Sequence, residues 1–134
     1  MDFRRLRKRG PLTANTDAAA LAEFLRGARR GVVFTGAGIS TESGIPDFRS
    51  PGGIWTQNAP IDYKDFLKSA EMRREAWRRR FAMEEMFGGA QPNEGHKAIA
   101  ELVARGMVVS VITQNIDNLH QVSGVPAEQI IEIH

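Results

Sequence analysis

The stretch from Gly36 to Arg49 carries the residue types that bind a phosphate group. An apolar, β-branched run at 32–35 ends in Gly-Ala-Gly, and hydroxyl residues, a third glycine at Gly44 and the turn sequence Pro-Asp-Phe-Arg follow. Glycines let the backbone turn sharply and let a ligand approach closer than a Cβ would permit. Free N–H groups and the dipole at the start of the next helix favour an anion. The pattern therefore predicts a site for the pyrophosphate of a dinucleotide.

The spacing of these glycines differs from the fingerprint of the dehydrogenases. The third glycine of that fingerprint would fall at position 41, which is Thr41. No acidic residue closes a second strand about twenty residues farther on, where a hydride-transfer enzyme holds the ribose. Gly-x-Gly alone is also typical of a plain turn. The spacing thus leaves the turn open as an alternative and disfavours an oxidoreductase.

Polar residues also follow two later apolar runs. Met107–Ile112 leads into Thr113–His120, and the run at 129–134 ends in His134. Polar residues at the carboxyl ends of parallel strands meet at the edge where open α/β sheets bind ligands. A histidine there can serve as a general base, because its ordinary pKa lies near neutrality. On spacing alone, however, a structural histidine is favoured, and Asp117 is equally consistent with the start of the next short helix.

The elements that must position these residues follow from periodicity and breakers. Buried strands, with both faces covered, are expected at about 32–35, 107–112 and 129–134. An amphipathic helix is predicted over Ala18–Arg30, capped by Asp17 or Thr16, with its apolar face at Leu21, Phe24, Leu25 and Ala28.

Two further helical regions are expected between the first two strands. Residues 51–91 are predicted to form a small helical module, with helices at 63–67 and 70–87 and with Trp77, Phe81 and Met86 as buried anchors. The following helix should begin after the cap Asn93 and end at Gly106. Its residues Ile99, Leu102 and Val103 should face the sheet, and His96 is expected to be a packed or exposed helix residue rather than a ligand.

Composition limits the classes of protein. The 134 residues are 42% hydrophobic and 25% charged, which is typical of a soluble globular domain, and no run approaches a membrane span. The absence of cysteine excludes disulfides and thiolate metal sites, and the three histidines are too scattered to suggest a zinc site. The arginine clusters at 4–9 and 73–80 lack any accompanying nucleic-acid motif. We therefore expect a cytoplasmic protein that binds neither membranes nor nucleic acid.

The whole run from Gly36 to Trp55 closely resembles the NAD-binding signature of the sirtuin family, the NAD-dependent protein deacylases. Thr113–His120 resembles the second sirtuin signature, and Glu132-Ile133-His134 resembles the strand that delivers the catalytic histidine. Pro92-Asn93 followed by His96 fits the intervening helix, and the resemblance covers roughly residues 20–134. It implies an α/β fold, namely an incomplete Rossmann-like parallel sheet with a small helical module inserted after the first strand.

The resemblance also implies roles for single residues. The loop at 36–40, with Ala37 in closest approach, would hold the phosphates of NAD, while Phe48 would shield the nicotinamide ribose and Arg49 would help to fix the cofactor. Gln114 and Asn115 would bind that ribose, Asp117 with the Ile116 backbone would hold the carboxamide, and His134 would be the base. The implied cofactor-binding residues are Gly36, Ala37, Gly38, Ser40, Ile45, Pro46, Asp47, Phe48, Arg49, Gln114, Asn115, Ile116, Asp117 and His134, with His134 and Asn115 as catalytic residues.

The implied reaction consumes NAD as a co-substrate. The carbonyl oxygen of an acyl-lysine protein or peptide displaces nicotinamide, and His134 then helps a ribose hydroxyl to attack, which yields lysine and O-acyl-ADP-ribose. Sirtuins that favour acidic acyl groups carry a Tyr-x-x-Arg pair in the helical module. The corresponding residues here are Ala76 and Arg79, which argues against a dedicated desuccinylase.

The resemblance stops at His134. We expect residues 1–15 to be a flexible basic leader and residues 16–134 to be the N-terminal part of a sirtuin catalytic domain that lacks its zinc ribbon and C-terminal half. Zinc is expected only in that missing part, and the fragment alone is expected to be poorly stable and inactive or weakly active. The alternatives are a protein mono-ADP-ribosyltransferase and a non-catalytic NAD-binding module. The sequence does not predict the oligomeric state.

Overall fold

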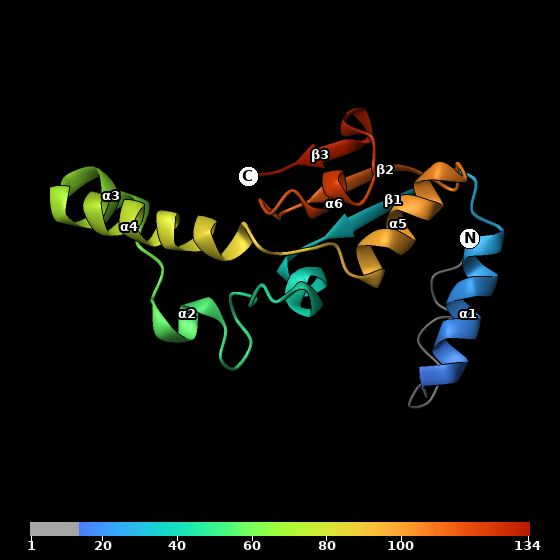
Figure 1. Cartoon of the computed structure of the whole chain (residues 1–134), viewed down its shortest axis with the longest axis horizontal. Helices are drawn as coiled ribbons and strands as arrows, with labels where there is room; N and C mark the ends of the chain where they lie inside the picture. The colour runs from blue at the N-terminus through green and yellow to red at the C-terminus, as the bar shows by residue number, and fades with distance from the viewer. Residues whose placement is uncertain (1–13) are drawn as a thin grey trace.

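A three-stranded parallel sheet in the order β1-β2-β3 forms the centre of the fold (Figure 1). The computed structural model describes residues 14–134, apart from the side chains at positions 14–17, 57 and 86. In chain order the elements are α1 (Ala14–Arg26), β1 (Gly31–Thr35), η2 (Ala37–Ser43), α2 (Ile54–Gln57), α3 (Tyr63–Lys68), α4 (Ala70–Phe87), α5 (Glu94–Ala104), β2 (Val108–Thr113), α6 (Leu119–Val122), η3 (Ala127–Gln129) and β3 (Ile130–Glu132). The predicted α/β fold, with helices inserted after the first strand, is confirmed.

The register of the sheet aligns the carboxyl ends of its strands. Thr35 of β1 pairs with Thr113 of β2, and Thr113 in turn pairs with Glu132 of β3. The three strands lie where the sequence predicts them, although β2 extends to Thr113 and β3 ends at Glu132. The segments that follow β1, β2 and β3 therefore all leave from one edge of the sheet.

One face of the sheet carries the buried core. Val103, Val108, Val111 and Val125 form this core, and Ile99, Leu102 and Val33 are among the residues that pack against it. Val32 and Phe34, on the other face, are 56% and 61% exposed. The prediction that both faces are covered is thus wrong for this part of the chain, because α5 and α6 lie on the same side of the sheet (Figure 1).

The helix α5 begins and ends as predicted. The side chain of Asn93 accepts hydrogen bonds from the backbone N–H groups of Gly95 and His96, and Gly106 beyond the helix adopts φ +69°. The Asn93 amide also donates to the Ile39 carbonyl at 2.7 Å and to Ser43 Oγ at 3.0 Å. One residue thus caps α5 and ties it to η2.

The helix α1 differs from the prediction at its expected cap and at its C-terminal end. It is described from Ala14 to Arg26, so Thr16 and Asp17 are both helical and neither is the N-cap. Polar side chains favour caps but also occur within helices, so composition did not separate the two kinds of position. Leu21 and Phe24 of the expected apolar face are 57% and 59% exposed. Most of the predicted leader, residues 1–13, lies outside the described residues.

The helices α3 and α4 project away from the sheet as a separate arm (Figure 1). Their bounds agree with the prediction, and Ser69 caps α4 through the N–H of Met72. Trp77 and Phe81 are not buried anchors: they stack on each other at 5.9 Å on the outer surface and are 56% and 58% exposed. The Met86 side chain lies outside the described residues.

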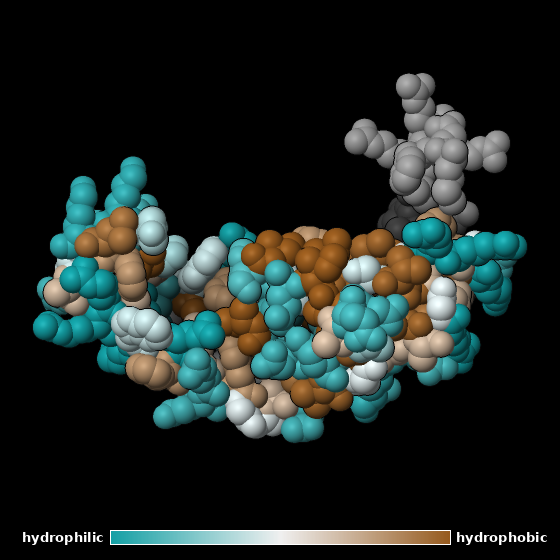
Figure 2. Space-filling model, turned by 90° about the horizontal axis from the view of Figure 1, so that it is seen from above, coloured by the Kyte–Doolittle hydropathy of each residue, from teal (hydrophilic) through white to brown (hydrophobic). Residues whose placement is uncertain are grey.

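Hydrophilic residues predominate on the arm, whereas apolar residues gather over the middle of the face seen in Figure 2. Among residues 14–134, no helix is both long enough and apolar enough to cross a membrane.

Candidate functional site

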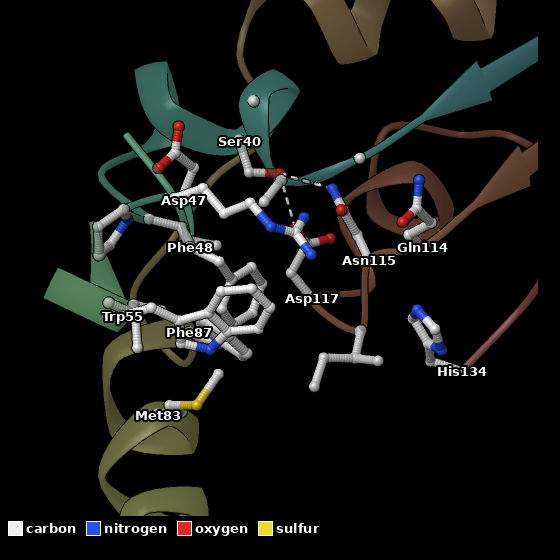
Figure 3. Close-up of a pocket in the computed structure, with 18 residues that line it drawn as sticks. Ser40, Asp47, Phe48, Trp55, Met83, Phe87, Gln114, Asn115, Asp117 and His134 are labelled. Carbon is white, nitrogen blue, oxygen red and sulfur yellow. Dashed lines mark hydrogen bonds between the residues drawn. The ribbon is translucent and has the colours of Figure 1, made fainter. Parts of the chain in front are cut away.

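One cavity of about 560 Å³ opens where β1 and β2 end (Figure 3). Every residue assigned to the site from the sequence lines this cavity. Four further residues also line it, namely Ile54, Trp55, Met83 and Phe87. The cavity has two unlike walls: Phe48, Trp55, Met83 and Phe87 lie on one side, and Gln114, Asn115 and His134 lie on the other (Figure 3).

A buried hydrogen-bond network forms the base of the polar wall. Ser40, which is fully buried, donates from Oγ to Asp117 Oδ2 over 2.6 Å and accepts from Asn115 Nδ2 over 3.2 Å. The other carboxylate oxygen of Asp117 accepts from the backbone N–H of Leu119 at 3.0 Å. Asp117 therefore binds the first N–H group of α6 (Leu119–Val122), although the N-cap position is Asn118 and not Asp117 as the turn interpretation expects, and Asp117 also lines the cavity.

The ends of β1 and β2 hold the neighbouring residues in place. The backbone N–H of Gln114 donates to the Thr35 carbonyl at 3.1 Å, and that of Asn115 donates to Thr113 Oγ1 at 3.0 Å. Asn115 is thus fixed through both its backbone and its side chain and is 9% exposed. Gln114, in contrast, is exposed and can move toward a ligand.

The glycine loop leaves open backbone beside this network. Gly36 is extended, and η2 begins directly after it at Ala37. A Cβ added at Gly38 would meet no heavy atom within 4 Å, so no group of the described chain fills that space. The first N–H groups of a helix lack carbonyl partners within it, and here they accompany a glycine pair that a ligand can approach closely.

A closed loop at 47–55 forms the apolar wall. The N–H groups of Ile54 and Trp55 donate to the carbonyls of Asp47 and Phe48 at 2.8 and 2.9 Å. The rings of Phe48 and Trp55 lie 5.4 Å apart, and the Arg49 guanidinium lies 4.5 Å from the Trp55 ring centre. Cation–π contact of this kind holds the arginine against the wall.

Asp47 closes the other end of this loop. Its carboxylate accepts hydrogen bonds from the Ser50 hydroxyl and, at 2.9 Å, from the Ser50 backbone N–H. The Ser50 hydroxyl, and then its N–H, hold the pKa of Asp47 below its ordinary value. A Cβ at Gly53 would lie 2.7 Å from the Asp47 carbonyl, so only glycine fits this turn.

His134 lies at the margin of the cavity. It follows β3 by two residues, and the N–H of Ile133 continues the ladder by donating to the Thr113 carbonyl at 3.0 Å. The His134 side chain is exposed and lies on the same side as Gln114 and Asn115 (Figure 3). Its position allows contact with a ligand in the cavity.

The sequence contains a signal for only two of the four additional lining residues. Ile54 and Trp55 fall inside the signature-like run that ends at Trp55, so that run contains a signal for them. Met83 and Phe87 belong to α4, where helical spacing indicates only packing within the module. Their place on the cavity depends on how α4 is oriented relative to the sheet.

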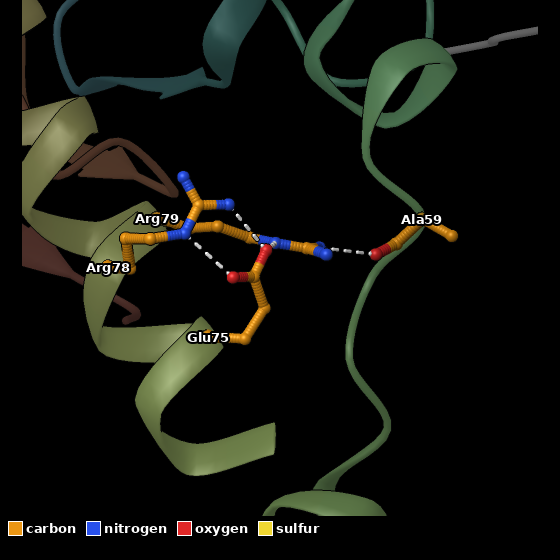
Figure 4. A network of polar contacts seen from close by, with 4 residues as sticks. All are labelled: Ala59, Glu75, Arg78 and Arg79. Carbon is orange, nitrogen blue, oxygen red and sulfur yellow. Dashed lines mark hydrogen bonds and ion pairs between the residues drawn. The ribbon is translucent and has the colours of Figure 1, made fainter. Parts of the chain in front are cut away.

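A polar network on α4 borders the site (Figure 4). Glu75 accepts hydrogen bonds from Arg78 and from Arg79 Nε at 2.7 Å, and Arg79 Nη1 donates to the Ala59 carbonyl at 2.8 Å. Arg78 and Arg79 line a second cavity of about 560 Å³, which shares Phe48 and Trp55 with the first. The arginine predicted near the site is present, but partners within the chain hold it.

The cavity combines groups that suit a large ligand of mixed polarity. The apolar wall can pack against a planar ring, the amide and carboxylate groups can bind hydroxyls or an amide, and the open glycine backbone can accept an anion. A dinucleotide carries all of these groups.

Comparisons with known proteins point to one family. The model of the family described as Sir2 family matches residues 36–134. NAD-dependent protein deacetylase 1 of Bradyrhizobium diazoefficiens is 60% identical over 114 residues, which cover 85% of this chain and 45% of that protein. The chain spans about half the length of the curated relatives it matches.

Two solved structures are also similar. One, a complex of a Sir2 homologue mutant with ADP-ribose, has a TM-score of 0.76 and 36% identity, and the match covers 86% of this chain and 45% of that one. The other, Sir2 with a p53 peptide and NAD+, has a TM-score of 0.65 and 41% identity, covering 86% and 44%.

Proposed function

Because the chain belongs to the Sir2 family, we propose that it forms the NAD-binding part of an NAD-dependent protein lysine deacetylase. This membership confirms the resemblance found in the sequence. The deacetylase named among its relatives and the structures with ADP-ribose and NAD+ support the choice of co-substrate.

The observation that carries the proposal is the largely buried Ser40–Asn115–Asp117 network at the base of the cavity. It brings a signature-like loop after β1 and a second one after β2 into hydrogen-bond contact, at 2.6 and 3.2 Å. Ser40 is fully buried and Asn115 is 9% exposed, so water competes little for the hydrogen bond between them, while Asp117 is half-buried at the cavity. The network therefore presents fixed amide and carboxylate groups to a ligand in the cavity.

NAD fits the remaining features of the cavity. The glycine loop with Ala37 would hold the phosphates, and the loop with Asp47, Phe48 and Arg49 would cover the nicotinamide ribose. Ile45 and Pro46 line the turn between these two loops, and Ile45 is buried. Gln114 and Asn115 would bind the ribose, and Asp117 with the Ile116 backbone would hold the carboxamide.

The reaction needs orientation and exclusion of water more than strong acid or base chemistry. NAD supplies a ribose carbon from which nicotinamide can leave. Asn115 orients the ribose, Phe48 shields it from water, and His134 accepts a proton from a ribose hydroxyl. An acyl-lysine peptide or protein is the proposed second substrate, and the relative solved with a p53 peptide supports a peptide substrate. A cytoplasmic location stays a prediction from the sequence.

The test uses the full-length protein that contains this chain. Incubated with NAD and an acetyl-lysine peptide, it should release nicotinamide and deacetylated peptide in equal amounts. His134→Ala should abolish deacetylation but retain ADP-ribose binding, whereas the exposed control Glu128→Ala should behave as wild type. Transfer of label from NAD to protein without deacetylation would instead indicate an ADP-ribosyltransferase. A protein that binds ADP-ribose but releases no nicotinamide would be a non-catalytic binding module.

A further inference from the structure

Two histidines lie side by side behind the cavity without lining it. His96 of α5 is fully buried and His120 of α6 is 1% exposed, and their ring centres are 5.1 Å apart at an angle of 58°. Burial lowers the pKa of both, while the Asp117 carboxylate acts in the opposite direction. Both rings are therefore neutral near pH 7, and the roles proposed for the cavity residues do not involve either ring.

His120 joins a line of hydrogen bonds that leads to the cavity. Its Nε2 lies 2.9 Å from Thr35 Oγ1, and Thr35 Oγ1 donates to Thr113 Oγ1, also over 2.9 Å. Thr113 Oγ1 accepts the backbone N–H of Asn115 at 3.0 Å. Thr35, Thr113 and Asn115 are 7%, 2% and 9% exposed, so water does not replace these bonds.

The surroundings of Nδ1 favour one tautomer of His120. Within residues 14–134 Nδ1 has no hydrogen-bond partner, so a proton there would be a buried donor without an acceptor. A proton on Nε2 instead donates to Thr35 Oγ1, which leaves the single hydrogen of the Thr35 hydroxyl for Thr113.

We propose that His120 is a positioning residue, which orients Asn115 in the cavity through the hydroxyls of Thr35 and Thr113. This inference rests on the proposed function, in which Asn115 binds the nicotinamide ribose. The parallel register places Thr35 directly opposite Thr113, which brings the two hydroxyls together. The ring of His96 packs against that of His120 and supports its orientation.

Loss of the hydrogen bonds from His120 to Asn115 should disturb the part of the site that binds the nicotinamide ribose more than the part that binds the phosphates. Thr35 and Thr113 lie at the strand ends that carry Asn115, whereas the phosphates would bind at the glycine loop. Because small misplacements of substrate reduce rates strongly, we expect a loss of about 10-fold to 100-fold in kcat for nicotinamide release. The affinity for ADP-ribose should change by less than about threefold, since uniform binding is largely retained.

The test compares matched variants of the full-length protein. Thr35→Val removes the hydroxyl at constant shape and should lower kcat. Thr35→Ser keeps the hydroxyl and should retain the wild-type kcat. His120→Leu should act like Thr35→Val, and His120→Gln, which keeps an N–H donor, should retain most of kcat. Combining Thr35→Val with His120→Leu should cost no more than either change alone, because both break the same line.

The proposal is overturned if folded Thr35→Val keeps the wild-type kcat or if Thr35→Ser loses as much kcat as Thr35→Val. It is also overturned if the losses in kcat caused by Thr35→Val and His120→Leu add in the double variant. Should His120→Leu not fold, the Thr35 pair decides. A second readout is the NMR signal of the Asn115 backbone N–H without substrate, which should shift in Thr35→Val but not in Thr35→Ser. An unchanged signal contradicts the positioning role even if the wild-type protein proves not to be a deacetylase.

Discussion

Ser40 Oγ lies 2.6 Å from Asp117 Oδ2, although 77 residues separate the two in the chain. Ser40 follows β1 and Asp117 follows β2, and the parallel pairing of these strands brings the residues together. The bond is charge-assisted and leads into a cavity, so it shapes both the fold and the site.

Replacing Ser40 should weaken both the stability of the fold and the function of the site. Ser40→Ala leaves Asp117 Oδ2 and Asn115 Nδ2 without their partner, and a buried unsatisfied polar group costs about 1–3 kcal/mol. Thermal unfolding should therefore occur at a lower temperature, and nicotinamide release should slow. Ser110→Ala, which also removes a hydrogen bond but lies away from the cavity, is the control. Equal rates of nicotinamide release in the two variants would contradict the role given to Ser40.

A methyl group at Gly53 should open the loop at 47–55. A Cβ there would lie 2.7 Å from the Asp47 carbonyl and 2.9 Å from the Ser50 carbonyl, so the turn must shift. Gly53→Ala should raise the Kd for NAD. Gly89→Ala is the matched control, because a Cβ at Gly89 meets no heavy atom within 4 Å. Isothermal titration with NAD compares the two, and unchanged affinity in Gly53→Ala would show that this loop does not cover the ligand.

The buried histidines predict how stability depends on pH. Burial lowers the pKa of His96 and His120 below the ordinary value of 6.5, and the charge of His96 would lower that of His120 further. Below pH 6.5 the unfolded chain binds protons that the folded chain does not, so stability should fall as the pH drops from 6.5 toward the lowered pKa values. Above pH 6.5 neither histidine makes the stability depend on pH.

Unfolding by urea at a series of pH values measures this effect in the full-length protein. His120→Gln removes one of the two groups and should make the slope below pH 6.5 shallower. A slope that does not change in this variant would mean that other groups cause the pH dependence.

The network around Glu75 predicts acyl preference. Hydrogen bonds from Arg78, and then from Arg79, lower the pKa of Glu75 to about 2, so the carboxylate stays ionised and occupies both arginines. Ala76 supplies no hydroxyl to help bind an acid. We expect acetyl-lysine to be favoured over succinyl-lysine by at least about tenfold in kcat/KM, since an acid would have to displace Glu75.

Paired peptides that differ only in the acyl group measure this preference. Glu75→Gln should narrow the difference by releasing Arg79, whereas Glu71→Gln, at an exposed position on the same helix, should leave it unchanged. A wild-type preference for succinyl-lysine would contradict the assignment.

The sequence predicted the positions of the strands and of the residues at the cavity better than it predicted which faces of the elements are buried. The strands, the bounds of α4 and the Asn93 cap follow from local signals such as β-branched runs and capping residues. The residues of the site follow from their place at strand ends and from the family signatures. These features depend on a few neighbouring residues, so a single sequence contains the information.

Burial of whole faces was predicted less well. Apolar spacing marks Val32, Phe34, Trp77 and Phe81 as residues suited to burial, yet all four are more than half exposed. Periodicity shows which residues share a face but not what packs on that face. The bond from His120 to Thr35 also joins residues 85 positions apart and has no local signature.

The two walls of the cavity are built from different parts of the chain. The polar wall is fixed in the buried network at the ends of β1 and β2, whereas Met83 and Phe87 come from an arm that projects away from the sheet. Substitutions on the arm can therefore reshape one wall without disturbing Ser40, Asn115 or Asp117. In the proposed enzyme, substitutions on the arm can therefore change the preference for the acyl substrate, while the residues at the ends of β1 and β2 keep the same NAD site.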